Sequence, residues 1–481
     1  MSAPTGGLPT AAPAAQGVDA RGIARFLDHL EGAANVEPHA ITVVRHGHTV
    51  ATGHWAPYTP DRLRLLYSLS KSFTSTAVGL AAAEGLLTLD DLVVDHFPAY
   101  ADDAADDRVR RLRVRHLLAM SSGHAVDTWP AVVAAGLDDP VQAFLRLPPD
   151  AEPGTLFRYN QSATYTAAAI VQDRSGSPLG DFLRPRLFDP LGVGPVAWTD
   201  QPGGRALGFS GLHATHDAIA RLGQLYLQHG RWDGRALLPP EWVAEATRHQ
   251  ADTPDEPNPD WRQGYGFQFW PGRHGFRGDG AYGQYCIVLP EQDAVVALNT
   301  ATVDMQAVLD AVYDLLLPAF RDAPLHDASV QDATLAQRLA SLALPTPSRS
   351  PRPSHAAAWD GVTLEPGPGA RRVQPSLTGL RTGADGTLTF VEGDTSFAVR
   401  LGAGWQVQDA EVEPTGARLP VATAGGWLED GSLRVHLRFL ETPHTAVVVA
   451  PAGGGAFRLL WPTIPLHVGH LHDLRAPDRR S

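Results

Sequence analysis

The sequence of 481 residues contains a single cysteine, Cys286. One thiol cannot form a disulfide within the chain, and it cannot supply the cysteine cluster of a zinc or iron–sulfur site. Cys286 lies in the apolar run 284–289, which predicts a buried strand. We therefore expect Cys286 to pack as a small hydrophobic residue.

Long apolar runs and dense basic clusters are also missing. No stretch approaches the roughly 18 consecutive apolar residues that indicate a membrane-spanning helix, and residues 1–7 lack the charged and apolar regions of a signal peptide. The formal net charge of −13 opposes binding to phosphate backbones. We expect a soluble, cytoplasmic protein without a nucleic-acid or membrane partner, and the sequence makes no prediction of oligomeric state.

Lysine is the scarcest basic residue. The chain has 39 lysines and arginines together, and only Lys71 is a lysine. Arginine stays protonated at any working pH, whereas the surroundings of a lysine can lower its pKa enough for it to accept a proton. A chain that uses arginine almost everywhere therefore predicts a chemical role for its one lysine.

The length predicts two or three domains at roughly 150 residues each. The Ala-, Gly- and Pro-rich residues 1–20 indicate a flexible leader. Residues 21–325 place strands near both ends and helices between them, which predicts an α+β domain with an antiparallel sheet flanked by helices. A helix and a Pro-rich linker follow over 326–355. Residues 356–481 alternate in short runs broken by glycines, which predicts a C-terminal antiparallel β-sandwich or barrel.

Ser68 and Lys71 stand three residues apart at the start of a helix predicted over 68–85. This spacing places both side chains on one face within hydrogen-bonding reach, near the N–H groups and positive end of the helix dipole. A serine hydroxyl needs an adjacent base to act as a nucleophile, and a lysine of lowered pKa can be that base. The alternative is a solvated helix lysine, which the uniqueness of Lys71 disfavours.

Two further segments carry candidate chemistry. Tyr159 stands at a predicted loop-to-helix junction, where a tyrosine can exchange a proton beside a Ser/Lys pair; the alternative is a packing tyrosine. The segment Asp279-Gly280-Ala281-Tyr282 enters the strand that holds Cys286. Its small residues allow close approach of a ligand, and its N–H groups suit an oxyanion. A plain glycine-rich strand entry is the alternative.

Three histidines lie close together at His467, His470 and His472, a spacing that is compatible with a metal site. No cysteine accompanies them, and the stretch follows a proline-broken β run. We therefore favour a solvated or packing role for these histidines over metal binding.

Taken together, the motifs resemble the class C β-lactamase and penicillin-binding-protein family of serine hydrolases, in its esterase-type branch. Ser68-x-x-Lys71 matches the first family motif. Tyr159 matches the tyrosine of the Tyr-x-Asn motif, with Gln161 in place of the asparagine. Asp279-Gly280-Ala281 falls where the family has Lys or His, any residue, then Gly. Three other segments share the resemblance: 114–123, 217–226 and 237–243. In all, the resemblance covers roughly residues 20–320.

The resemblance implies a β-lactamase/transpeptidase-like fold and an acyl-enzyme on Ser68. It implies that Lys71, assisted by Tyr159, takes the serine proton, and that Gln161 orients the substrate carbonyl. The N–H groups of Ser68 and of a residue near Tyr282 would bind the oxyanion. This chemistry requires neither a metal nor an organic cofactor.

Asp279 departs from the family because it replaces the cation that holds a substrate carboxylate. Three residues are candidates for a replacement cation: Arg273, His274 and Arg277. We therefore expect a carboxylesterase or amidase acting on a small-molecule ester or amide, rather than a true β-lactamase. The alternatives are a transacylase using the same acyl-enzyme and a non-catalytic, penicillin-binding-like binder. The C-terminal domain is either a lid over the active site or a subunit contact.

Overall fold

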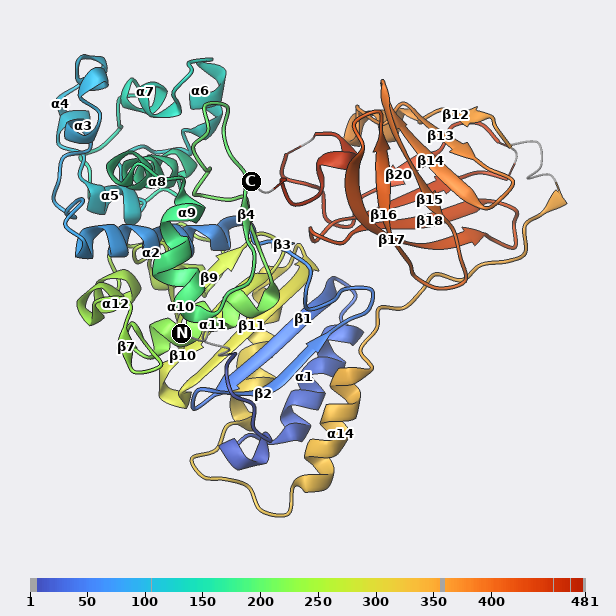
Figure 1. The fold of residues 1–481 in the computed structure, drawn as a ribbon, viewed down its shortest axis with the longest axis horizontal. Helices are drawn as coiled ribbons and strands as arrows, with labels where there is room; N and C mark the ends of the chain where they lie inside the picture. Colours follow the sequence, from blue (N-terminus) through green and yellow to red (C-terminus); the bar gives the residue numbers. More distant parts are fainter. Residues whose placement is uncertain (1–6, 105, 355–359, 453, 468, 479–481) are drawn as a thin grey trace.

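The computed structural model describes residues 7–104, 106–354, 360–452, 454–467 and 469–478. The start of the predicted leader and the junction at 355–359 lie outside the described residues. Figure 1 shows a first domain of helices around a central sheet and, beside it, a C-terminal domain built mainly of strands. Each domain has its own cluster of buried apolar side chains.

The helices and strands have the following bounds. The α-helices are α1 (Ala20–Gly32), α2 (Ser70–Ala83), α3 (Val93–His96), α4 (Asp107–Arg110), α5 (Val114–Leu118), α6 (Trp129–Ala134), α7 (Pro140–Leu145), α8 (Gln161–Ser175), α9 (Leu179–Leu183), α10 (Asp189–Leu191), α11 (His216–Leu227), α12 (Pro240–Thr247), α13 (Met305–Ala311), α14 (Ser329–Ala340) and α15 (Pro368–Val373). The strands are β1 (Val36–Arg45), β2 (His48–His54), β3 (Arg64–Leu65), β4 (Ala197–Trp198), β5 (Leu212–Ala214), β6 (Arg231–Trp232), β7 (Arg235–Ala236), β8 (Trp270–Gly272), β9 (Gly275–Gly280), β10 (Gln284–Leu289), β11 (Ala294–Thr302), β12 (Thr363–Leu364), β13 (Gly379–Thr382), β14 (Thr387–Glu392), β15 (Thr395–Arg400), β16 (Gln406–Glu413), β17 (Ala417–Trp427), β18 (Leu433–Phe439), β19 (Thr445–Ala450) and β20 (Arg458–Leu460).

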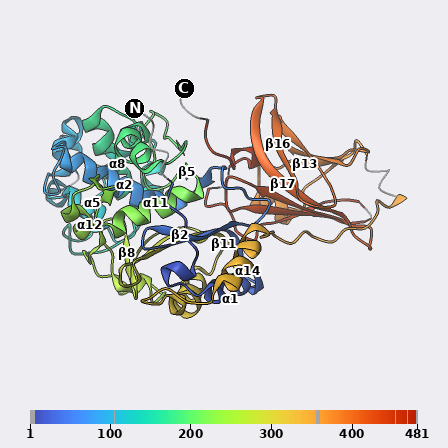
Figure 2. The ribbon, with the colours of Figure 1, turned by 60° about the horizontal axis from the view of Figure 1, so that its bottom comes forward.

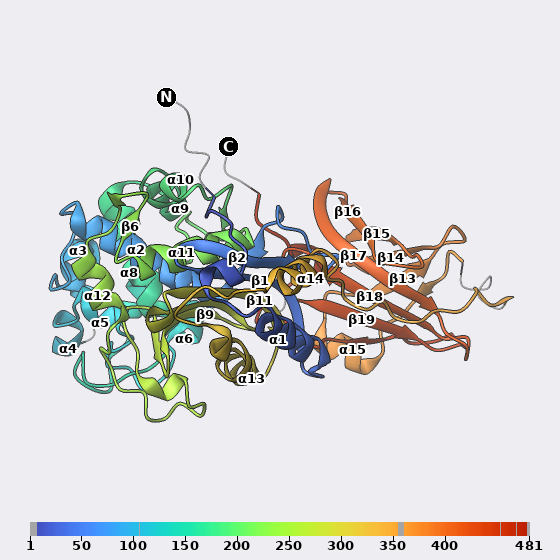
Figure 3. The same cartoon turned by 90° about the horizontal axis from the view of Figure 1, so that it is seen from below.

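The central sheet joins strands from both ends of the first domain. Its order is β2-β1-β11-β10-β9-β8, and every neighbouring pair is antiparallel. Strand β10 is buried along its whole length, as a strand covered on both faces must be. Figure 3 shows α11 on one side of the sheet and α1 and α13 on the other. The predicted antiparallel sheet flanked by helices is confirmed.

Helix α2 lies at the centre of the first domain, packed against α8. Residues 70–81 of α2 are buried, because small side chains let the surrounding elements approach on all sides. The predicted helix over 68–85 begins later than expected. Ser68 lies in a single 3-10 turn, Tyr67–Leu69, directly before α2. The middle of the domain, predicted to be mostly helical, also contains the short strands β4 to β7.

The C-terminal domain is one antiparallel sheet whose nine strands follow in chain order from β12 to β20. Its two ends meet, because the Phe457 N–H donates to Glu365 O and the Gly367 N–H donates to Phe457 O, both at 2.9 Å. The sheet therefore curls around its own core, as Figure 2 shows beside the first domain. The predicted antiparallel β domain is confirmed in its barrel form, rather than as two stacked sheets.

The segments predicted as leader and linker contact the first domain where the structure describes them. Val18 is completely buried, and the Thr49 N–H donates to Pro9 O at 2.7 Å. The Ala56 N–H donates to Leu342 O at 3.0 Å. Among the described residues, every helix is too short or too polar to cross a membrane.

Candidate functional site

The turn that carries Ser68 lies directly against strand β9. A Cβ atom on Gly280 would stand 2.1 Å from Leu66 O, and one on Gly278 would stand 2.4 Å from Ser72 Oγ. Glycine is required at both positions because any side chain would push the strand away from the turn. The small residues of the predicted strand entry thus place the backbone of β9 beside Ser68.

The Lys71 Nζ atom has three neighbours within hydrogen-bonding distance. It lies 3.2 Å from Ser68 Oγ, 2.6 Å from Gln161 Oε1 and 2.9 Å from Phe209 O. The last two atoms can only accept, so they take both N–H groups of a neutral amine. The lone pair of that amine then faces the Ser68 hydroxyl.

Burial sets the protonation of the two titratable groups beside Ser68. It lowers the pKa of Lys71 to about 7, against the opposing charges of Asp127 and Asp279. Burial also raises the pKa of Tyr159, which interacts with the Ser68 side chain. Lys71 can therefore exist as a free base near neutral pH, whereas Tyr159 keeps its proton.

The predicted residues Ser68, Lys71, Tyr159 and Gln161 come together at the start of α2 and α8. Tyr159 stacks on Trp270, and its ring centroid lies 4.6 Å from Lys71 Nζ. Gln161 Oε1 contacts Lys71, and the orienting of a substrate carbonyl by the Gln161 amide stays a prediction. The longer glutamine arm reaches the amine because Asn160 caps α8 and leaves Gln161 as its first residue.

Asp279 lies in the site and already has a cation. Its Oδ2 is 3.0 Å from Arg277 Nε, and both side chains are buried. Arg273 is instead paired with Asp260 and Asp310. Burial raises the pKa of Asp279, and Arg277 and Lys71 oppose that shift. The charge of Arg277 is therefore neutralised by Asp279. Arg277 does not supply a free cation that could bind a substrate carboxylate in place of the family's third-motif residue.

The backbone N–H groups expected to bind the oxyanion belong to Ser68 and to the turn between β9 and β10. The Ser68 and Tyr282 amides have no acceptor within the part of the chain that the structure describes. Tyr282 has a φ of +66°, which turns the chain between β9 and β10. The predicted positions Gly280, Ala281 and Tyr282 form this turn.

The C-terminal domain also reaches the site, where His444 lies beside the rings of Tyr67 and Tyr282. Tyr67, with a φ of +50°, hydrogen-bonds through its hydroxyl to His444 Nε2. His444 Nδ1 lies 2.9 Å from Thr463 O, which only accepts. Nδ1 therefore carries the proton, and Tyr67 donates to Nε2. In the same cluster of rings, the Tyr282 hydroxyl donates to the backbone oxygen of Ile464.

A pocket of about 450 Å³ opens at Ser68. Its walls come from the turn before α2, from α6 and the loop before it, from α8, from the segment before β5, and from the C-terminal domain. The lining residues are Tyr67, Ser68, Asp127, Trp129, Pro130, Val133, Gln161, Phe209, Ser210, Leu466 and His467. Sequence reasoning missed Asp127 and Leu466, and for His467 it favoured a solvated or packing role over metal binding without placing it in the site. A cavity of about 700 Å³ near Glu37 and Trp55 contains none of the predicted site residues.

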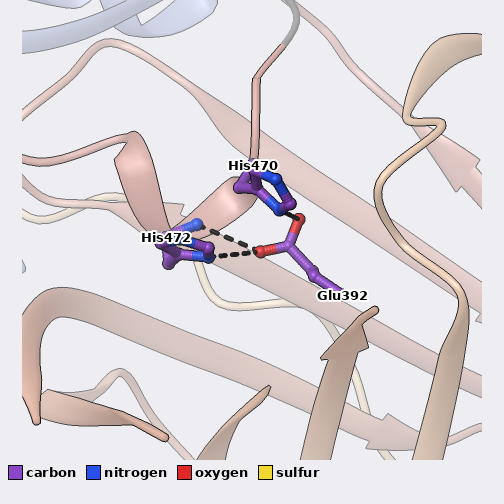
Figure 4. Close-up of side chains that lie close together, drawn as sticks. All are labelled: Glu392, His470 and His472. Carbon is purple, nitrogen blue, oxygen red and sulfur yellow. Dashed lines mark hydrogen bonds and ion pairs between the residues drawn. The ribbon is translucent and has the colours of Figure 1, made fainter. Parts of the chain in front are cut away.

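His470 and His472 meet a third residue that the sequence did not indicate, Glu392 (Figure 4). Their ligand atoms lie within 4.8 Å of one another, so they could present one carboxylate and two imidazoles to a metal. The carboxylate is already bonded within the chain. It lies 2.9 Å from His472 Nδ1 and accepts from the Leu471 N–H at 2.7 Å. Glu392 thus fastens the segment after β20 to strand β14.

Comparison with known proteins identifies relatives of the first domain. A model of the family described as Beta-lactamase matches residues 23–318. Penicillin-binding protein 4 of Amycolatopsis lactamdurans is 27% identical over 282 residues, which cover 50% of this chain and 73% of that protein. Lovastatin esterase of Penicillium rubens is 28% identical over 167 residues, which cover 30% of this chain and 42% of that protein.

Solved structures share the fold of the first domain. One is EstCE1, described as a hydrolase with promiscuous acyltransferase activity. It superposes with a TM-score of 0.51 at 18% identity and covers 62% of this chain and 98% of that chain. At this identity the likeness concerns the fold alone.

Proposed function

The chain belongs to the beta-lactamase family, and we propose that it is a serine hydrolase that cleaves a small-molecule ester or amide through an acyl-enzyme on Ser68. The contact between Lys71 and Ser68 carries this proposal, because it directs the lone pair of a neutral amine at the serine hydroxyl. The esterase relative agrees with this reaction class.

The first half of the reaction transfers the acyl group to Ser68. Lys71 removes the hydroxyl proton while Ser68 Oγ attacks the substrate carbonyl, and the resulting oxyanion binds to the Ser68 and Tyr282 N–H groups. The carbonyl reforms as the bond to the leaving group breaks. Tyr159, which keeps its proton, donates to the leaving alkoxide or amide nitrogen, and the Lys71 ammonium restores the Tyr159 proton.

The second half releases the acid. Neutral Lys71 removes a proton from water, which attacks the acyl carbonyl, and the tetrahedral intermediate collapses with return of that proton to Ser68 Oγ. The buried Arg277–Asp279 pair offers no free cation for a substrate carboxylate. A carboxylesterase or amidase is therefore favoured over a β-lactamase.

Release of p-nitrophenol from p-nitrophenyl acetate and butyrate tests the proposal. We expect turnover in the wild type and none above background in Ser68→Ala and Lys71→Ala. Mass spectrometry of the quenched wild type should show the acyl group on Ser68. Turnover that persists without Ser68 would reject the proposed nucleophile.

A further inference from the structure

The pocket at Ser68 has one acidic side chain in an otherwise mostly apolar wall. Asp127 lines it together with five apolar residues: Trp129, Pro130, Val133, Phe209 and Leu466. A carboxylate on a pocket wall attracts a positive group of a ligand and repels a negative one.

Asp127 is held in place through only one of its oxygens. Oδ1 accepts from the Gln161 N–H at 2.9 Å and from the Trp129 N–H at 3.2 Å. No arginine, lysine or histidine nitrogen of the described chain lies within 4.0 Å of this carboxylate. The Gln161 and Trp129 amides fix its position, and its second oxygen is left for a ligand.

The other charges around the pocket do not supply a counter-ion. Asp279 already has Arg277, and the N–H groups of Lys71 are directed at Gln161 Oε1 and Phe209 O. His467 lines the pocket from the C-terminal domain and is exposed to solvent. Asp127 is therefore the one acidic side chain among the described residues that line this pocket, and it has no ion-pair partner there.

The pocket lies on the acyl side of Ser68. Tyr159, the proposed proton donor to the leaving group, is not among its lining residues, and neither is Asp279. A group that fills this pocket therefore belongs to the part of the substrate that remains on Ser68.

We propose that Asp127 binds a protonated amine on the acyl group, so that the preferred substrates are esters or amides of amino acids. This inference rests on the serine-hydrolase function proposed above. The ammonium binds to the free Asp127 oxygen, and the carbon chain of the acyl group packs on Trp129, Val133 and Leu466. An acyl group with a carboxylate is repelled.

The test compares p-nitrophenyl esters that differ only in the charge of the acyl chain. The pairs are 3-aminopropionyl with propionyl and 6-aminohexanoyl with hexanoyl, and the monoester of adipic acid supplies the anion. We expect kcat/KM of at least one amine ester to exceed that of its neutral partner about tenfold to hundredfold. The adipic ester should be the poorest substrate.

Two variants remove one negative charge from the same loop region. In Asp127→Asn the amide oxygen still accepts from Gln161 and Trp129, but the ratio of amine to neutral ester should fall to about one. Asp150 also binds this loop, through the Ala125 N–H at 2.7 Å, and does not line the pocket. Asp150→Asn should therefore keep the wild-type ratio. Measurement on the alkaline plateau removes effects of Asp127 on the Lys71 proton.

The outcomes separate the two proposals. Turnover that does not depend on Ser68 rejects the hydrolase function. Turnover that depends on Ser68 but shows no preference for either amine, or a preference that survives in Asp127→Asn, overturns the role of Asp127. Calorimetric titration of the Ser68→Ala protein with hexylamine and with hexanol makes the same comparison without turnover. Equal affinities would also overturn it.

Discussion

At the scale of single residues, the site depends on what burial does to one amine. A lysine in water is protonated at neutral pH and cannot accept a proton. Inside this chain, burial lowers the pKa of Lys71 to about 7, and two carbonyl-type acceptors hold its N–H groups. In the proposed mechanism, the side chain that elsewhere serves as a positive charge serves as a base.

The pH dependence follows from this shift. The active form has neutral Lys71, so kcat/KM for p-nitrophenyl butyrate should rise as pH increases through about 7 and then level off. Lys71→Arg keeps a cation but has no base, and we expect a loss of about 10²- to 10⁴-fold at every pH. A profile that falls between pH 6 and 8 would contradict the assignment of Lys71 as base.

The contribution of Tyr159 to the rate should increase with the basicity of the leaving group. Its proton is retained because burial raises its pKa, which suits a proton donor. A p-nitrophenolate leaves without help, whereas an alkoxide needs a proton. We expect Tyr159→Phe to lower kcat for butyl butyrate at least tenfold more than for p-nitrophenyl butyrate. An equal loss for the two esters would indicate a packing role.

At the scale of elements, strand β9 places its backbone beside the candidate site and also carries a buried ion pair. Its glycines bring it against the Ser68 turn, and Arg277 pairs with Asp279 between Trp261 and Trp270. Removing one member of such a pair leaves an uncompensated buried charge, which costs more than the pair itself contributes.

Arg277→Met should therefore lower the free energy of unfolding in urea by about 3–5 kcal/mol. The double variant Arg277→Met with Asp279→Asn should recover part of that loss, because no charge remains buried. Arg418→Met in strand β17 breaks an exposed pair with Glu411 and should cost much less. A double variant no more stable than the single one would argue against charge burial as the cause.

At the scale of the whole molecule, the pocket is completed by both domains. Leu466 lines it from the C-terminal domain and is 56% exposed, so its truncation should not disturb a core. We expect Leu466→Ala to shift the preferred p-nitrophenyl ester toward longer acyl chains, measured as kcat/KM from acetate to octanoate. Ile464, 51% exposed and outside the pocket lining, provides the matched control. If Ile464→Ala gave the same shift, the change in acyl-chain preference would come from the loop that holds both residues and not from the Leu466 side chain.

The sequence predicted the parts of the site that lie within short motifs. Ser68 and Lys71 lie three residues apart. Because Lys71 is the one lysine of the chain, the pair could be predicted from the sequence. Asp127 was missed because it stands outside those motifs and reaches the pocket only through its bond to Gln161. Glu392 was missed because nothing local links strand β14 to His470 and His472. The same limit applies to Leu466, whose place in the pocket depends on how two separately folded cores pack together.

Because the two domains share the pocket, its two parts are also synthesised at different times. Ser68 and Lys71 leave the ribosome about 400 residues before Leu466 and His467, which at 5–20 residues per second is a delay of roughly 20–80 s. During this interval the first domain can fold around its core with one wall of the pocket missing and with Tyr67 not yet bonded to His444. A nascent chain would therefore bear a nucleophile open to bulkier acyl groups than the finished protein admits, and selectivity would be acquired later than reactivity.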